Sequence, residues 1–128
     1  MYRWVTPLKH FRRTATVDTE ISGHPIAAGE KVVVWYASAN RDERAIEDPF
    51  RFDVGRDPRG FTHAAFGNGI HKCLGQHLAR LELVHMYREL LTRVPDIDLD
   101  GDVEFVRSNL FHGLKRMPVR FTPGSRSR

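Results

Sequence analysis

The feature that most constrains the fold is a regular spacing of apolar residues between residues 74 and 91. Leu74, Leu78 and Leu81 recur every three or four positions, His85 continues the same face, and Leu90 or Leu91 follows, with polar residues between them. This period predicts an amphipathic helix of about five turns, and Pro95 is placed to stop it. The rest of the chain predicts short strands and irregular segments, so the expected fold class is α+β with one long helix.

Three other segments predict the remaining elements. Residues 13–36 alternate apolar and polar side chains, with turns at "SGHP" and "AAGE" and a closing apolar run "VVVWY". This pattern predicts a hairpin followed by a buried strand. Residues 38–61 are rich in Asn, Asp, Pro and Gly, which indicates a long irregular segment of a kind that is uncommon unless functional. Residues 103–121 predict two short strands around a central "FHGL" turn.

Composition limits the classes of function. The chain has 128 residues, of which 41% are hydrophobic and 28% charged, as expected for one small globular domain. Its net charge of +4 comes from arginines mixed with acids along the whole chain, which indicates a solvated surface rather than a nucleic-acid-binding arm. No apolar run is long enough to predict a membrane span. The single cysteine predicts no internal disulfide and a reducing, cytoplasmic location.

That cysteine, Cys73, lies where a glycine-rich loop meets the predicted helix, in "AFGNGIHKCLG". A thiolate there is close to the positive end of the helix dipole and to unpaired backbone N–H groups. Gly67, Gly69 and Gly75 remove side chains where a large flat ligand would approach the backbone. The pattern favours a metal-bound thiolate beneath a planar cofactor.

Two other interpretations of Cys73 stay open on the residues alone. Cys73 and His77 are one helical turn apart, with His71 and His63 nearby, so a small zinc-binding domain is chemically feasible. Alternatively, Cys73 is a small buried hydrophobic residue. Both alternatives leave the surrounding glycines unexplained.

The spacing of Phe66, Gly69, Cys73 and Gly75 fits F-x-x-G-x-x-x-C-x-G. It resembles the haem-ligand signature of the cytochromes P450, which are haem-thiolate monooxygenases. The resemblance implies haem b bound through the Cys73 thiolate, which favours O–O cleavage. It also implies that Phe66 shields the sulfur and that Gly75 and Ala79 make room for the porphyrin. The positions that would hold the haem propionates are Arg13, His63 and His71.

The resemblance extends along the chain and predicts the C-terminal part of the mostly helical P450 fold, with small hairpins, a meander, the cysteine loop and a long proximal helix. Residues 1–123 would form this haem-binding portion, and residues 124–128 a disordered tail. Two segments are similar to those that line the family's substrate pocket, and their candidate contacts are Thr6, Leu8, Asn109, Leu110 and Phe111. The likeness is to actinobacterial members that act on steroids or long-chain lipids.

For the intact enzyme, the resemblance implies O2-dependent hydroxylation of an apolar substrate. The electrons would come from NAD(P)H through a ferredoxin-type partner, for which Lys72 and Arg80 are candidate contacts. The chain resembles about the last third of a typical member and lacks the distal half, so we expect that alone it is not a competent monooxygenase. A catalytically inactive remnant or a haem-binding module is the alternative, and the missing N-terminal portion is a candidate partner.

A further departure concerns the E-x-x-R pair of the family. Arg3 corresponds to its arginine, whereas its glutamate would fall directly before Met1. In the family this glutamate forms a buried charged triad with two arginines, which correspond here to Arg3 and Arg51. The sequence therefore predicts two like charges that face each other, Arg3 and Arg51, as the remainder of the triad.

Overall fold

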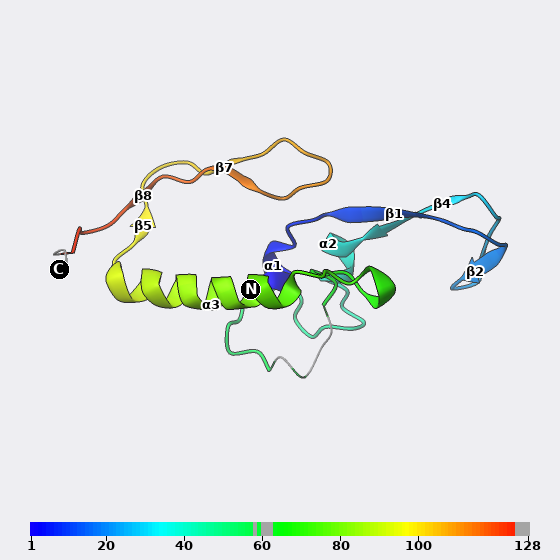
Figure 1. The fold of residues 1–128 in the computed structure, drawn as a ribbon, viewed down its shortest axis with the longest axis horizontal. Coiled ribbons are helices and arrows are strands. Elements are labelled where there is room, and N and C mark those ends of the chain that lie inside the picture. The colour runs from blue at the N-terminus through cyan, green and yellow to red at the C-terminus, as the bar shows by residue number, and fades with distance from the viewer. Residues whose placement is uncertain (58, 60–62, 125–128) are drawn as a thin grey trace. The chain divides into compact units, whose positions relative to one another are not determined.

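The computed structural model describes residues 1–57, 59 and 63–124, which form two compact units. The first unit contains Met1–Gly67 together with Ser108–His112, and the second contains Asn68–Arg107 and the chain from Gly113 onward. Figure 1 shows the elements along the chain. Apart from Gly124, the tail predicted to be disordered lies outside the described residues.

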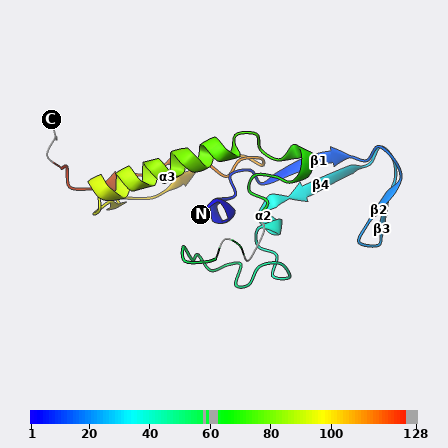
Figure 2. The same cartoon turned by 60° about the horizontal axis from the view of Figure 1, so that its bottom comes forward.

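The first unit is built on two antiparallel strand pairs and two single-turn helices, α1 (Tyr2–Val5) and α2 (Tyr36–Ala39). Strand β1 (His10–Thr14) pairs with β4 (Lys31–Trp35), and β2 (Thr19–Ile21) pairs with β3 (His24–Ile26) in a hairpin, as Figure 2 shows. The predicted hairpin and following strand are thus confirmed. The pairing of β4 with β1 was not predicted from the sequence.

The predicted burial of the apolar run "VVVWY" is wrong for the residues in β4 and right for Tyr36, which directly follows the strand. Val33, Val34 and Trp35 are 43%, 41% and 52% exposed. Strand β4 lies in a two-stranded sheet with β1, and a sheet of two strands cannot enclose both of its faces. The buried apolar residues of this unit follow the sheet in the chain instead: Tyr36 is 7% exposed and Ile46 is 2% exposed.

The hairpin turn between β2 and β3 provides a test of the fold. Ser22 and Gly23 both have positive φ, 53° and 82°, as in the two-residue turns that match strand twist. We expect Gly23→Ala to lower the free energy of unfolding by about 1 kcal/mol, because a Cβ is disfavoured in the left-handed region. A Cβ on Gly23 would meet no atom within 4 Å, so the cost is conformational rather than steric. Ser22→Asn is the matched control, since asparagine tolerates this region. If denaturant unfolding showed the same loss of free energy of unfolding in both variants, the assignment of this turn would be contradicted.

The irregular segment predicted after β4 is confirmed. From Asn40 to Asn68 the described residues form turns and bends, without a helix or strand. Hydrogen bonds from side chains to backbone carbonyls help to hold this segment in place. Arg56, for example, donates through Nη1 to the Glu47 carbonyl (2.7 Å) and through Nη2 to the Asp48 carbonyl (3.1 Å).

The second unit contains the predicted long helix, α3 (Gln76–Arg93), preceded by a single 3-10 turn, η1 (Gly69–His71). Helix α3 ends two residues before Pro95, as predicted, and the Val94 N–H still bonds to the Leu90 carbonyl (2.9 Å). Two short antiparallel pairs complete the unit: β5 (Asp98–Leu99) with β8 (Val119–Arg120), and β6 (Glu104–Phe105) with β7 (Leu114–Arg116).

The prediction for residues 103–121 is therefore correct in part. Strands β6 and β7 do pair, but "FHGL" is not a tight turn between them. Residues Ser108–His112 belong to the first unit, and a third strand, β8, follows β7 and pairs with β5. Backbone pairing with distant segments, rather than local turn chemistry, sets this arrangement.

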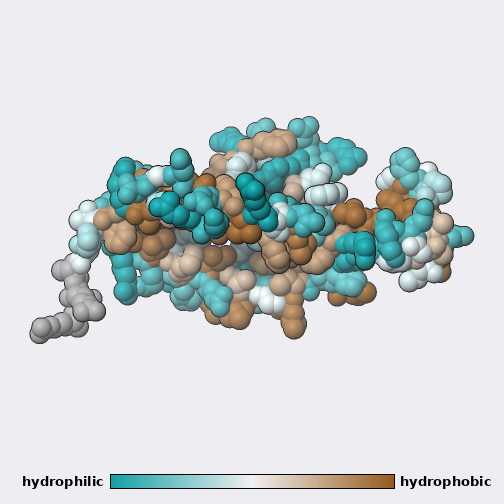
Figure 3. Space-filling view, turned by 90° about the horizontal axis from the view of Figure 1, so that it is seen from above, coloured by the Kyte–Doolittle hydropathy of each residue, from teal (hydrophilic) through white to brown (hydrophobic). Residues whose placement is uncertain are grey.

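The apolar positions of α3 are exposed in this structure. None of its residues is buried, and Leu78 and Leu81 are 60% and 56% exposed. Figure 3 shows hydrophobic side chains at the molecular surface. Within the described residues, no helix combines the length and hydropathy that a membrane crossing requires.

Candidate cofactor site

Cys73 lies in a tight turn between η1 and α3. Before it, the Asn68 side chain accepts a hydrogen bond from the Gly69 N–H (2.8 Å), and the Lys72 N–H donates to the Gly69 carbonyl (3.1 Å). After it, the Ala79 N–H bonds to the carbonyl of Gly75, the N-cap of α3 (2.9 Å). Cys73 is a free thiol, and it is exposed. The structure thus excludes the alternative that Cys73 is a buried hydrophobic residue of this chain.

Two glycines flank Cys73 in the chain, and one of them lies beside the sulfur. Gly69 has a φ of 60°, and a Cβ built there would meet no other atom within 4 Å. A Cβ on Gly75 would lie 4.0 Å from the Cys73 Sγ. A side chain at Gly75 would therefore start beside the sulfur, where glycine leaves the approach to the thiol clear.

Apolar side chains flank the thiol and are almost fully solvent-exposed. Ile70 is 96% exposed and Leu74 is 99% exposed. An exposed thiol, a soft metal ligand, between exposed apolar side chains and glycines fits a large, flat, apolar metal complex such as haem. The residues present therefore fit the group that the sequence signature implies.

The predicted cofactor residues fall into two sets, one in each unit. Gly69, His71, Cys73, Gly75 and Ala79 lie in the second unit, where His71 is exposed at the end of η1 and Ala79 is half-buried in the first turns of α3. Arg13, His63 and Phe66 lie in the first unit.

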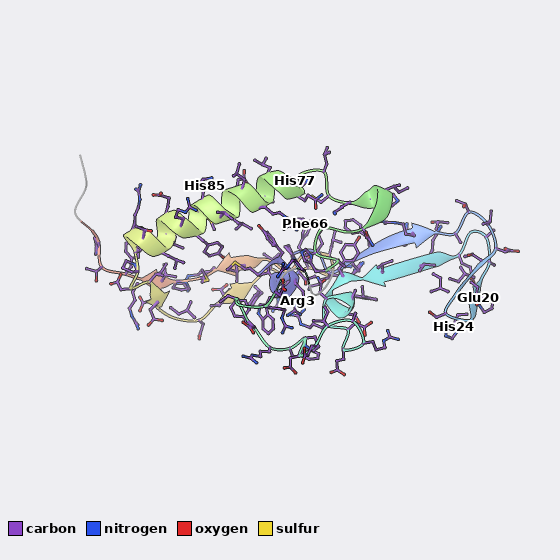
Figure 4. The ribbon with its side chains drawn as sticks, turned by 90° about the horizontal axis from the view of Figure 1, so that it is seen from below. Arg3, Glu20, His24, Phe66, His77 and His85 are labelled. Atoms are coloured by element: carbon purple, nitrogen blue, oxygen red, sulfur yellow. The ribbon has the colours of Figure 1, made fainter. Side chains whose placement is uncertain are left out.

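In the first unit, His63 and Phe66 lie together in an aromatic cluster with Tyr2. The Tyr2 ring is 5.0 Å from the Phe66 ring and 6.4 Å from the His63 ring, and the His63 and Phe66 rings are 5.9 Å apart, measured between centroids. Phe66 is labelled in Figure 4, where the side chains are drawn as sticks. Arg13 lies on β1 opposite Val32, with its guanidinium 5.8 Å from the centroid of the Phe11 ring.

The two segments predicted to contact substrate pair with each other, although about a hundred residues separate them. The Lys9 N–H donates to the Leu110 carbonyl (2.9 Å), and the His112 N–H donates to the Pro7 carbonyl (2.8 Å). Leu8 and Phe111 form the β-bridge between these contacts. Phe111 and Asn109 are exposed, and Leu8 and Leu110 are half-buried. The backbone thus brings both predicted segments to one place.

Thr6 differs from the other predicted substrate contacts. It is 2% exposed, and its hydroxyl donates to the Arg3 carbonyl (2.6 Å) and accepts from the Asn40 Nδ2 (2.8 Å). A hydroxyl with these two partners in the protein interior holds the backbone in place. In this structure Thr6 is a structural residue and does not reach a surface where substrate could meet it.

Arg3 is buried, at 6% exposure, and its Nη1 donates to the carbonyls of Asn40 (2.7 Å) and Pro49 (2.8 Å). Burial, and then the positive charges of Arg56 and Arg41, lower the pKa of Arg3. Buried cations need such acceptors, because desolvation without a partner is costly.

The predicted apposition of Arg3 and Arg51 is not seen. The Arg51 side chain is 67% exposed, and its Nη2 lies 3.9 Å from an oxygen of Asp53. The cations that influence Arg3 are Arg56 and Arg41. Arg41 donates to the Trp4 carbonyl (2.9 Å) and lies over the Trp4 ring, 5.3 Å from its centroid. Solvation and a nearby carboxylate keep Arg51 at the surface instead.

Sequence reasoning missed two residues, Tyr2 and Asn40. Tyr2 holds His63 and Phe66 through ring contacts, and Asn40 is fully buried (0% exposed) within the irregular segment. A fully buried asparagine leaves no periodic pattern, so no signal in the sequence identifies Asn40.

The zinc alternative receives no support from the structure. In the described part of the chain, no three or more His, Cys, Asp or Glu side chains are grouped so that they could hold a metal ion. His77 and His85, labelled in Figure 4, lie along α3. Cys73 with scattered histidines therefore does not form the closed ligand set of a structural zinc site.

Comparison with known proteins identifies the family. The family model described as Cytochrome P450 matches residues 1–94. Linalool 8-monooxygenase of Pseudomonas putida is 46% identical over 96% of this chain and 30% of its own length. Steroid C26-monooxygenase of Mycobacterium tuberculosis is 45% identical over 96% of this chain and 31% of its own length. The chain thus spans about a third of the length of the curated relatives it matches.

Solved structures that are similar to this chain belong to the same family. A Mycobacterium marinum cytochrome P450 in complex with pseudoionone matches with a TM-score of 0.88 and 48% identity, over 94% of this chain and 28% of that one. Cytochrome P450-153 from Novosphingobium aromaticivorans matches with a TM-score of 0.85 and 47% identity, over 94% and 30%. These likenesses confirm the predicted fold class, an α+β part of the P450 fold. From the match to residues 1–94 and the agreement of sequence and fold over nearly its whole length, the chain belongs to the cytochrome P450 family.

Proposed function

We propose that residues 1–123 form the haem-binding portion of a cytochrome P450 monooxygenase, with Cys73 as the thiolate ligand of haem b. The observation that carries this proposal is the exposed free thiol of Cys73, set between glycines and exposed apolar side chains at the start of α3. When bound, haem would supply the reductive activation of O2, which consumes two electrons and two protons, inserts one oxygen atom into a C–H bond of the substrate and releases the other as water.

The residues around Cys73 would bind and orient the cofactor. Gly69 and Gly75 leave room for the macrocycle beside the sulfur, and the half-buried Ala79 extends this small-residue surface along α3. Phe66, held by the Tyr2 ring, would exclude water from the thiolate. Arg13, His63 and His71 carry the groups that would bind the two propionates, whose negative charges require cationic or hydrogen-bonding partners.

The substrate would be apolar. The relatives are named for linalool, a steroid and a methyl-branched lipid, and we propose a terpenoid, steroid or lipid for the intact enzyme. The paired segments would form part of the pocket wall, with Phe111, Asn109, Leu110 and Leu8 as contacts. The buried Thr6 would fix the first segment instead of touching the substrate.

Electrons from NAD(P)H would arrive from a ferredoxin-type partner in the cytoplasm. Lys72, directly before Cys73, and Arg80 on α3 are both exposed, and they would attract an acidic surface near the sulfur. Complementary charge of this kind steers association more than it adds affinity.

Haem reconstitution of the chain tests the proposal. We expect one haem per chain and, after reduction and addition of carbon monoxide, the long-wavelength Soret band of a thiolate-bound haem. Metal analysis of the same sample should find iron rather than zinc. Failure to bind haem, or a Soret band of the nitrogen-ligand type alone, would refute the proposal.

A further inference from the structure

Asn40 connects three separate segments of the first unit through one buried side chain and its own backbone. Its Nδ2 donates to the Thr6 hydroxyl (2.8 Å), and its Oδ1 accepts from the Ala64 N–H (2.7 Å). Its carbonyl accepts from Arg3 Nη1 (2.7 Å), and its N–H bonds to the Tyr36 carbonyl (2.9 Å). A fully buried amide with both of its ends bonded fixes its neighbours strongly, because each unmade bond would leave a desolvated polar group.

The contact with Ala64 sets the start of a turn. The Ala64 carbonyl accepts from the Gly67 N–H (2.9 Å), and Gly67 has a φ of 70°, so the chain reverses within residues 64–67. The Ala65 N–H lies 3.3 Å from His63 Nδ1. His63 directly precedes Ala64 and Phe66 follows it by two positions, so the orientation of the Ala64 peptide determines where both side chains leave the backbone.

The same network holds the other side of the aromatic cluster. Arg3 bonds to the Asn40 carbonyl, and its own carbonyl accepts from Thr6, so α1 is fixed to Asn40 at two points. Tyr2, which contacts the rings of both His63 and Phe66, is the first residue of α1. Asn40 therefore holds in place the backbone on both sides of the cluster. One side is the turn that carries His63 and Phe66, and the other is the helix that carries Tyr2.

We propose that Asn40 is a positioning residue that fixes the orientation of His63 and Phe66. Its relevance to haem rests on the proposed function, in which Phe66 shields the Cys73 sulfur and His63 binds a propionate. An aspartate at position 40 would keep an oxygen acceptor for the Ala64 N–H but would lose the donor to the Thr6 hydroxyl, whose own proton is bonded to the Arg3 carbonyl. An alanine would remove both interactions.

Amide hydrogen exchange of the chain without haem is the primary test. We expect Asn40→Ala to accelerate exchange of the Ala64 N–H about tenfold, the effect of losing one buried hydrogen bond, and Asn40→Asp to retain slow exchange. Ile46→Val is the matched control, because it loosens the packing of a residue that is 2% exposed in the same unit without removing a partner of Ala64. Equal acceleration in Asn40→Ala and Ile46→Val, or none in Asn40→Ala, overturns the proposal.

A second measurement does not depend on whether Asn40→Ala folds. In the unmodified chain, nuclear magnetic resonance should detect a scalar coupling across the hydrogen bond between the Ala64 amide nitrogen and the Asn40 side-chain carbonyl carbon. Its presence supports the assignment, and its absence overturns it.

The haem-loaded chain adds a spectroscopic readout. After reduction and addition of carbon monoxide, Asn40→Ala should lose the thiolate-type Soret band about tenfold faster than the unmodified chain, whereas Ile46→Val should not. If Cys73→Ser has the same spectrum as the unmodified chain, the proposed function fails, and the exchange of Ala64 still decides the role of Asn40.

Discussion

Cys73→Ser is expected to abolish the thiolate-type Soret band of the reduced, carbon-monoxide-bound chain completely. A serine hydroxyl is a harder and much less acidic donor than a thiol, so it does not replace a thiolate on haem iron. The chain contains one cysteine, and no other side chain can supply sulfur of this kind. The measurement is the absorption spectrum at matched haem and protein concentrations.

His77→Ala is the control for Cys73→Ser. His77 is exposed on the first turn of α3, close to Cys73 in sequence, and it is the histidine that the zinc alternative would require. Its removal should leave the Soret band unchanged. A spectrum that survives Cys73→Ser but changes in His77→Ala would assign the ligand to nitrogen.

Arg3→Met is expected to destabilise the chain by about 3 kcal/mol. Methionine keeps most of the apolar volume of the side chain, but it removes the donors that satisfy the carbonyls of Asn40 and Pro49. Those carbonyls lie in the buried part of the first unit, so they would be left without this charged donor. Denaturant unfolding, followed by the fluorescence of the tryptophans, measures the difference in free energy.

Arg44→Ala is the matched control for Arg3→Met. The Arg44 side chain is 89% exposed and pairs with Asp42 at the surface, where such pairs contribute little to stability. The hydrogen bonds from Arg44 lower the pKa of Asp42, but both groups are solvated. Equal unfolding midpoints for Arg3→Met and Arg44→Ala would show that the buried position of Arg3 is wrong.

Local sequence signals predicted the elements that depend on near neighbours. The apolar period and Pro95 predicted α3, and the "SGHP" turn predicted the β2–β3 hairpin. The resemblance of the segment from Phe66 to Gly75 to the family signature pointed to Cys73 without any knowledge of the fold, and its role as ligand stays a prediction.

Long-range pairing could not be predicted in the same way. Nothing local in residues 5–9 identifies residues 108–112 as their partner. The two segments are joined by main-chain hydrogen bonds, which form in the same way whatever most of the side chains are. Burial was also misjudged for Val33 and Val34, because an apolar run indicates burial only when a second layer covers it. The Asn40 network is held by individual polar contacts, which leave no periodic trace in the sequence.

The central claim is that the Cys73 sulfur binds haem iron. X-ray absorption at the iron edge of the haem-loaded chain tests it most directly, because sulfur and nitrogen scatter differently at short range. The account predicts one sulfur neighbour of iron in the unmodified chain and in His77→Ala, and none in Cys73→Ser. An iron surrounded only by nitrogen or oxygen in the unmodified chain would contradict it.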